Sequence, residues 1–186
     1  MDPNENQVDA TKKVVLLSIK GIVEDQLPGE PVDETLGGLL PECSQEEEAV
    51  NDVVSQIRRV AKGLEKDTLL QQSINALPVV SLEAFRKIVD KVIADGITWE
   101  SITVLLFVSG KFIVKLIKEH LQQSLPDILA WIWDFFQRRI LSWIVQQGGW
   151  VSCLSFFGAS AVQCYAILSG AFLCVLFVMW RAGRSS

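Results

Sequence analysis

Apolar side chains occupy every side of the helical wheel in one stretch of the chain, residues 99–118, which reads WESITVLLFVSGKFIVKLIK. A helix without a polar face must be surrounded by other elements. Thr98 precedes the stretch and can cap its free amide groups. The stretch is long enough to cross a membrane, but Lys111 interrupts it, and a lysine near a bilayer centre costs about 3 kcal/mol. The pattern therefore predicts a buried central helix.

The first part of the chain changes from polar to amphipathic and then to irregular. Residues 1–10 are polar and are expected to be disordered. Residues 14–27 place their apolar side chains near one helical face, which predicts an amphipathic helix. Residues 28–45 are rich in proline, glycine and acidic residues, and their apolar positions follow no helical or strand periodicity. This composition indicates a mobile loop.

A second amphipathic helix is predicted from about residue 46, with charged residues between its apolar positions. Its apolar stripe consists of Val53, Ile57, Val60 and Leu64. Such a stripe packs into a core in most proteins and binds a partner in the others. Two shorter helices are expected after it, one capped by Asp67 and one capped by Ser81.

Another long helix is predicted for residues 127–147, where Trp, Phe and Ile dominate the wheel. The short polar connection after His120 makes this helix an antiparallel neighbour of the central one. Gly148 and Gly149 end it, and residues 150–157 form a short apolar turn.

The last apolar segment, residues 161–180, contains no charged side chain and is followed by Arg181 and Arg184. This length fits a bilayer span, so we expect a C-terminal transmembrane anchor over residues 159–181 behind a helical domain at residues 11–158. Such an anchor inserts after synthesis and leaves the domain facing the cytosol. The alternative is a hydrophobic core helix. The anchor positions singled out are Ala161, Leu173, Val178 and Trp180.

Composition and charge narrow the class of protein further. The chain has 186 residues, of which 49% are hydrophobic, and a formal net charge of -5. Residues 1–50 contain twelve acidic and three basic side chains, whereas residues 101–186 contain three acidic and seven basic ones. This gradient excludes a nucleic-acid binder and fits a C-terminal half that approaches an anionic membrane. The cysteines, at positions 43, 153, 164 and 174, lack CxxC spacing, so free thiols are expected.

The sequence contains no recognisable catalytic motif. No GxSxG, GxxxxGK[ST], GxGxxG or HExxH pattern occurs. His120 is the one histidine and sits at a helix end, where capping carbonyl groups is its expected role. Asp90 and Asp95 lie among lysines and are interpreted as solvated charges. We therefore expect no enzyme, no metal and no cofactor.

Two motifs within this pattern resemble those of the Bcl-2 family of apoptosis regulators. DGITWESITVLLFVSGKFIV, residues 95–114, resembles the first homology motif of the family, and WIVQQGGW, residues 143–150, resembles the second. GIVEDQ at residues 21–26 and the region around WIVQQGGW are similar to the Bax branch. The resemblance covers nearly the whole chain. It implies an all-α bundle of eight to nine helices around a buried central helix, with a surface groove for a partner's third-motif helix.

The same resemblance implies which residues form the interaction surfaces. The third-motif-like helix face comprises Val53, Ile57, Val60, Ala61, Lys62 and Leu64. The groove comprises Trp99, Glu100, Ile102, Leu105, Val108, Trp143, Gly148, Gly149 and Trp150.

Two departures from the family pattern fall on one expected contact. Val60 is followed by Ala61 and Lys62, where the third motif has a small residue and an aspartate. Trp99 is followed by Glu100 and Ser101, where the first motif has glycine and arginine. We expect Lys62 of one molecule to meet Glu100 in the groove of another as a reversed ion pair. The alternative is two solvated surface charges.

The function implied by the resemblance is that of a Bax-like effector, which homo-oligomerises in the mitochondrial outer membrane and permeabilises it to release cytochrome c. A survival-type guard that sequesters pro-apoptotic helices in its groove is the alternative, and a tail-anchored helical adaptor is a third hypothesis. The expected partners are a second copy of the chain, pro-apoptotic activator helices, survival-type family members and membrane lipid, but no nucleic acid. The cytosol and the endoplasmic reticulum are further expected locations.

Overall fold

The computed structural model describes residues 3–36, 48–66, 72 and 82–156, and these residues are helical apart from the connections between helices. The α-helices are α1 (Pro3–Gln26), α2 (Val32–Thr35), α3 (Glu48–Glu65), α5 (Leu82–Val92), α6 (Trp99–Lys118), α7 (Leu125–Phe135), α8 (Leu141–Gln146) and α9 (Cys153–Phe156). The 3-10 turns η1 (Gln122–Ser124) and η3 (Trp150–Ser152) and the π-helical segment η2 (Phe136–Ile140) connect some of them.

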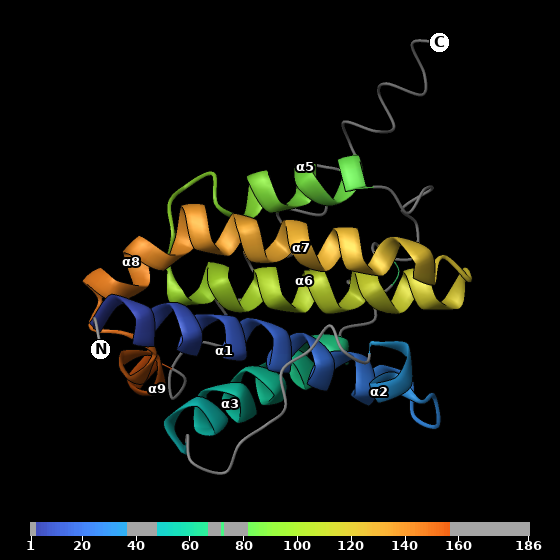
Figure 1. Ribbon diagram of the computed structural model, residues 1–186, viewed down its shortest axis with the longest axis horizontal. Coiled ribbons are helices and arrows are strands. Elements are labelled where there is room, and N and C mark those ends of the chain that lie inside the picture. The colour runs from blue at the N-terminus through green and yellow to red at the C-terminus, as the bar shows by residue number, and fades with distance from the viewer. Residues whose placement is uncertain (1–2, 37–47, 67–71, 73–81, 157–186) are drawn as a thin grey trace, which may run out of the picture.

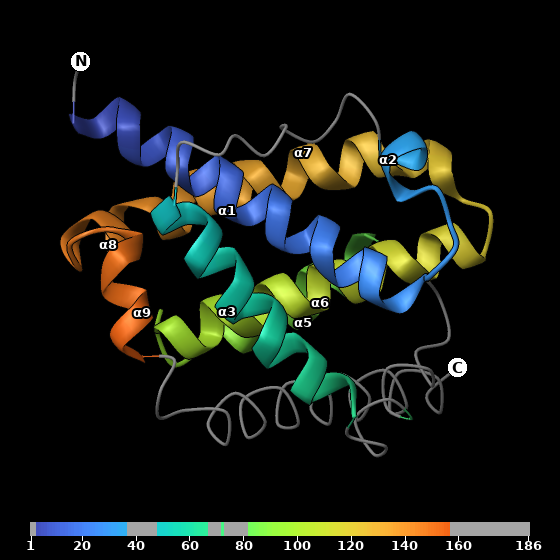
Figure 2. The same cartoon turned by 90° about the horizontal axis from the view of Figure 1, so that it is seen from below.

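The central helix α6 runs through the middle of the bundle. It lies between α1 and α3 on one side and α5 and α7 on the other (Figure 1). Figure 2 shows α1 and α3 on the near side, with α6 behind them. Every residue from Ser101 to Gly110 is buried. The buried central helix predicted from the apolar wheel of residues 99–118 is therefore confirmed, and so is the all-α bundle that the resemblance implies.

The start of α6 follows the local sequence signal. The backbone N–H of Ser101 donates to Oγ1 of Thr98 over 3.1 Å, and the backbone N–H of Thr98 donates to Oγ of Ser101 over 2.8 Å. This reciprocal capping box satisfies amide groups that the first turn leaves free. Gly96 precedes it with φ at 114°, a conformation that suits glycine. The expected cap at Thr98 is confirmed.

Helix α1 begins earlier than the sequence pattern predicts. Residues 3–10 belong to the helix, so the expectation of disorder there was wrong for these residues. Thr11, which follows these residues, is fully buried and accepts a 3.0 Å hydrogen bond from Nε1 of Trp150, so this part of α1 is attached to the bundle. The expected loop at residues 28–45 is likewise partly ordered, because Val32 and Leu36 are buried and α2 forms between them.

The long helix predicted for residues 127–147 is divided by a π-helical segment. Helix α7 lies beside α6, as predicted for an antiparallel neighbour (Figure 1). The chain then passes through η2 into α8 without leaving the helical path. Gly148 and Gly149, with φ at 96° and 88°, end it where expected.

Several expectations lie outside the described residues. They include the caps at Asp67 and Ser81 and the anchor over residues 159–181, with Ala161, Leu173, Val178 and Trp180. Among the helices that are described, none is long and apolar enough to cross a membrane.

Candidate functional site

The third-motif-like helix α3 turns its apolar stripe into the core. Val53, Ile57 and Leu64 are buried against neighbouring helices, and α3 contacts both α1 and α6. Ala61 is buried as well, whereas Val60 is only half-buried. Ala61 completes the stripe because positions 57, 61 and 64 are spaced by four and three residues, which puts them on one helical face. The α3 face is thus packed inward in this structure, a state called docked below.

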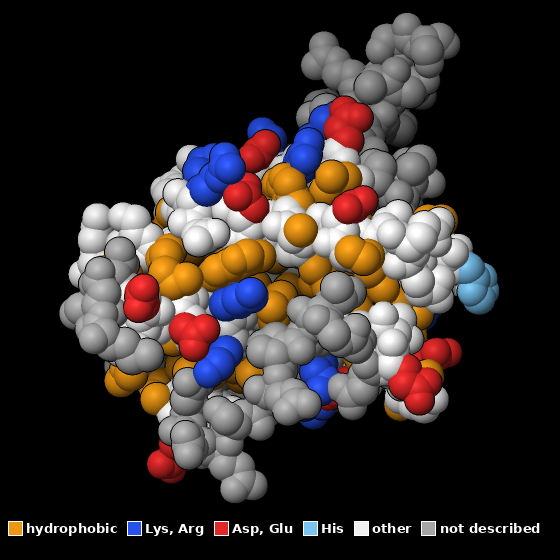
Figure 3. Space-filling model, in the orientation of Figure 1, with side chains coloured by type: hydrophobic (Ala, Val, Ile, Leu, Met, Phe, Trp, Pro, Cys, Tyr) orange, Lys and Arg blue, Asp and Glu red, His pale blue; other side chains and the backbone are white. Residues whose placement is uncertain are grey.

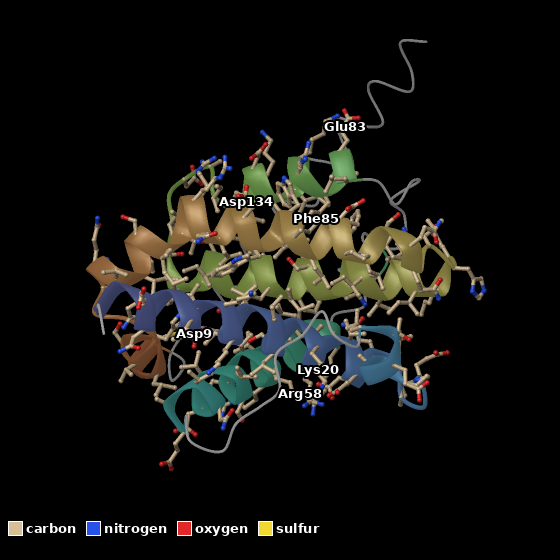
Figure 4. All side chains as sticks on the ribbon, viewed as in Figure 1. Asp9, Lys20, Arg58, Glu83, Phe85 and Asp134 are labelled. Atoms are coloured by element: carbon tan, nitrogen blue, oxygen red, sulfur yellow. The ribbon has the colours of Figure 1, made fainter. Side chains whose placement is uncertain are left out.

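A cluster of charges joins the outer edge of α3 to α1. Arg58 donates from Nε to Oδ2 of Asp25 over 2.7 Å and from Nη2 to Oδ1 over 2.6 Å. Nζ of Lys62 lies 3.7 Å from the same Oδ1, and Nη2 of Arg58 lies 3.9 Å from Oε2 of Glu24. Figure 4 shows Arg58 beside Lys20 of α1 at this seam.

The pKa values at this cluster reflect the pairing. The hydrogen bond from Arg58 lowers the pKa of Asp25 below its model-compound value of 3.8, against a smaller opposing effect of burial. The hydrogen bond to Asp25 raises the pKa of Arg58 in turn. Both charged forms are therefore favoured by the docked arrangement.

A second ion pair joins the end of α3 to the middle of α6. Nζ of Lys111 donates to Oε1 and Oε2 of Glu65 over 2.9 and 3.1 Å. The Lys111 side chain is only 11% exposed, and burial lowers its pKa despite the attraction of Glu65. The lysine that interrupts the apolar wheel of residues 99–118 thus has a carboxylate partner on α3.

A pocket opens along the α1–α3 seam between these two ion pairs. Its volume is about 430 Å³. The lining residues are Ile22, Asp25, Gln26, Ala61, Lys62, Glu65 and Lys66. Of these, the sequence singled out only Ala61 and Lys62 as functional. The α1 residues were missed because their role depends on the approach of α3.

Three of the predicted groove residues form a tryptophan cluster. The ring centroids of Trp99 and Trp143 lie 4.9 Å apart, and those of Trp99 and Trp150 lie 5.5 Å apart. Trp99 comes from α6, Trp143 from α8 and Trp150 from η3. The glycine pair at positions 148 and 149 makes this possible by turning the chain back between the last two. The structure therefore brings together residues of the first and second motifs.

The N-terminal half of α1 supports this cluster. Trp150 is held by the hydrogen bond from its Nε1 to Thr11, and a Cβ added at Gly149 would lie 3.0 Å from Nε2 of Gln7. Glycine at position 149 thus allows α1 to approach. Sequence reasoning missed Thr11 and Gln7, because neither carries a local signal.

The predicted groove floor is not open in the docked state. Ile102, Leu105 and Val108 are each 1% exposed, so they are core residues here. Glu100 is half-buried in the first turn of α6. Figure 3 shows hydrophobic side chains gathered across the middle of one face, with the charges of α5 above them and His120 exposed at one end. The side chains of the predicted groove floor are therefore not accessible to a partner helix in this structure.

Comparison with known proteins gives a family match. The sequence model described as "Apoptosis regulator proteins, Bcl-2 family" matches residues 57–150. The chain is 26% identical to the apoptosis regulator BAX of Bos taurus over 175 residues, which covers 91% of this chain and 88% of that protein. It is 23% identical to human Bcl-2-like protein 1 over 92 residues, which covers 50% of this chain and 40% of that protein.

Two solved structures share the fold. The crystal structure of chicken BOK matches with a TM-score of 0.61 and 16% identity, over 83% of this chain and 98% of that one. The structure of Trichoplax adhaerens trBcl-2L2 bound to trBak BH3 matches with a TM-score of 0.59 and 18% identity, over 81% of this chain and 99% of that one.

Proposed function

The chain belongs to the Bcl-2 family of apoptosis regulators, and we propose that within this family it is a Bax-like effector. In this proposal the protein resides in the mitochondrial outer membrane and α3 leaves its docked position. Released α3 helices then join molecules by binding a neighbour's groove, and the assembly permeabilises the membrane so that cytochrome c escapes.

The observation that carries this proposal is the extent of the similarity to BAX. That similarity runs over 91% of the chain, whereas the match to Bcl-2-like protein 1 is confined to 50% of it. The docked position of α3 is a second support. Its apolar face is buried at present, so the helix has a hydrophobic surface that a second molecule could bind once the helix is released.

A survival-type guard is the second candidate function. The match to Bcl-2-like protein 1 supports it, and so does the shared fold with trBcl-2L2, a protein whose structure was solved with a bound BH3 segment. A guard would use the tryptophan cluster and the predicted groove floor to hold another protein's helix and would leave the membrane intact.

Dye release from vesicles separates the two functions. The purified full chain is added to dye-filled vesicles containing anionic lipid, with or without a peptide of residues 48–65. Release by the chain supports the effector proposal, whereas tight peptide binding without release supports a guard. A matched peptide carrying Ile57→Glu and Leu64→Glu is the control, because it lacks the apolar stripe. An adaptor without apoptotic role would bind neither peptide and release no dye.

Membrane residence is the part of the proposal that depends on residues 159–181. Residues 161–180 contain no charged side chain, and each CH₂ group transferred into lipid contributes about 0.8 kcal/mol. We expect most of the protein in unstressed cells to resist carbonate extraction from the mitochondrial fraction. Recovery of most of it in the soluble fraction would contradict this expectation. Expression in cells that lack their own effectors should restore cytochrome c release.

A further inference from the structure

The pocket on the α1–α3 seam has the size of a small-molecule site. Its volume of about 430 Å³ lies near the C-terminal ends of the two helices, which run in the same direction here (Figure 2). Ligand pockets in proteins usually measure about 300–1,000 Å³. Ile22 of α1 and Ala61 of α3 supply apolar wall. The pocket can therefore receive the apolar part of a small ligand.

The two carboxylates on the pocket wall are already paired with cations that reach them from outside the lining. Both oxygens of Asp25 accept hydrogen bonds from Arg58, over 2.6 and 2.7 Å. Both oxygens of Glu65 accept hydrogen bonds from Nζ of Lys111, over 2.9 and 3.1 Å. Because their charge is balanced in this way, these acids repel an entering anion less than unpaired acids would.

Two lysines add positive charge at the edge of the pocket. Lys62 and Lys66 lie four residues apart at the end of α3, and both line the pocket and are exposed. Nζ of Lys62 lies 3.7 Å from Oδ1 of Asp25, but Arg58 already donates to that oxygen over 2.6 Å. Within the described part of the chain, Lys66 has no ion-pair partner. The charge left at this edge therefore favours an anion.

We propose that this pocket binds a phosphate monoester with an apolar organic part. The phosphate lies between Lys62 and Lys66, and the apolar part lies against Ile22 and Ala61. A phosphate monoester fits the two ammonium groups better than a carboxylate does, because it carries a charge of about −1.5 to −2 at pH 7. A free phosphate monoester and the head of a lysophosphatidic acid both present this chemistry. The site does not depend on the effector function.

Gln26 supplies a further polar group to the same wall. Its Oε1 makes no hydrogen bond within the described residues, so turning the amide toward a ligand breaks no bond of that oxygen. The amide group can then donate from Nε2 to a phosphate oxygen. The pocket thus combines apolar wall, two cations and a neutral donor.

Isothermal titration calorimetry on the intact chain in a non-ionic detergent measures this binding. Phenyl phosphate is the probe with both parts, whereas inorganic phosphate lacks the apolar part and phenol lacks the charge. Phenyl phosphate should bind about tenfold more tightly than either, because burial of its ring adds to the charge contacts. Lys62→Gln and Lys66→Gln should each weaken its binding by about threefold, and the double variant by about tenfold.

Matched substitutions test whether the pocket, and not the general charge of α3, holds the probe. Arg59 is exposed on the same helix but does not line the pocket, so Arg59→Gln should leave the affinity unchanged. Lys62→Arg and Lys66→Arg keep the charge and should keep most of the affinity. These side chains are exposed, so the variants should unfold in urea like the native chain. Equal weakening by Arg59→Gln would overturn the proposal.

A competition arm distinguishes the two sources of the ligand. The titration with phenyl phosphate is repeated in micelles doped with lysophosphatidic acid or with lysophosphatidylserine, an anionic phosphodiester. Weaker apparent binding with lysophosphatidic acid alone assigns the pocket to a lipid head, and unchanged binding in both assigns it to a free phosphate monoester. Either outcome supports the site. If phenyl phosphate binds no more tightly than inorganic phosphate, or if both lysine substitutions leave its affinity unchanged, the pocket is not a phosphate monoester site. Neither result depends on dye release.

Discussion

Asp25 illustrates what the sequence could and could not predict for a single residue. Its partner Arg58 lies 33 positions away, so no local pattern marks the pair. The cap at Thr98 was predictable because its partner Ser101 is three residues away. The helix end at Gly148 was also predictable, because glycine favours the positive φ found there. Residues whose roles depend on neighbours in sequence were found, and those whose roles depend on the approach of distant helices were not.

Acid should weaken the contribution of Asp25 to stability. The pKa of Asp25 in the folded chain is lower than its model-compound value of 3.8. The carboxylate therefore contributes its full stabilisation above 3.8 and loses it as the pH falls through the lower, folded value. The difference in unfolding free energy between the native chain and Asp25→Asn should be constant near neutral pH and shrink below 3.8 in urea denaturation. A difference that does not shrink in acid would contradict this assignment.

Gly110 should tolerate no larger residue, because α1 crosses α6 at this point. A Cβ added there would lie 2.5 Å from Cγ2 and 2.9 Å from Cβ of Ile22. Gly110→Ala should lower the free energy of unfolding by about 1–3 kcal/mol, the usual range for an overpacked core. Urea denaturation gives the value. Ile22→Ala should make space, so the double variant should lose less than the two single variants together.

At the scale of elements, periodicity predicted the helices that bury one apolar face. The stripes of α3 and α5 repeat at helical spacing, and both helices occur where expected. Periodicity missed the first turns of α1, because residues 3–10 are mostly polar and carry no apolar stripe. It also missed the π-helical segment η2, since apolar residues continue on both sides of it. The choice of Ala61 over Val60 for the buried stripe became clear only from the direction in which α1 and α6 approach.

The contact between α1 and η3 should depend on the hydroxyl group of Thr11. Thr11→Val keeps the shape of the side chain but removes its hydroxyl group. Nε1 of the buried Trp150 then loses its hydrogen-bond acceptor. A buried donor that loses its acceptor costs about 1–3 kcal/mol, so urea denaturation should show a loss of that size. Thr11→Ser is the matched control because it retains the acceptor. Equal losses in the two variants would show that packing of the methyl group matters and the hydrogen bond does not.

At the scale of the whole molecule, the surfaces that the resemblance predicts for binding are buried in this structure. The α3 stripe and the groove residues Ile102, Leu105 and Val108 are buried, whereas the charged residues around them remain at the edges. The sequence could indicate which residues share a helix face. It could not indicate whether that face is open in the resting molecule, since this depends on the packing of several helices together.

Of the two charged residues predicted to form the reversed ion pair, Lys62 is more exposed than Glu100. Its side chain is 59% exposed, and its 3.7 Å approach to Asp25 is long for a hydrogen bond. Glu100 occupies the first turn of α6, where the helix dipole favours an acid. Released α3 could therefore exchange the weak contact with Asp25 for one with Glu100 of a second molecule. A desolvated interfacial pair of this kind can couple by about 1.5–7 kcal/mol, whereas an exposed one contributes about 0–1 kcal/mol.

A double-mutant cycle in self-association tests this reversed pair. Lys62→Glu and Glu100→Lys should each weaken assembly on vesicles, and the double variant should recover it, because opposite charges again face each other. Lys62→Glu also places a second acid beside Asp25 and would loosen docked α3. The cycle is therefore repeated in an Asp25→Asn background, where that repulsion is absent. Recovery in both backgrounds assigns the contact to Lys62 and Glu100. Additive losses in both would mean that the two residues do not meet.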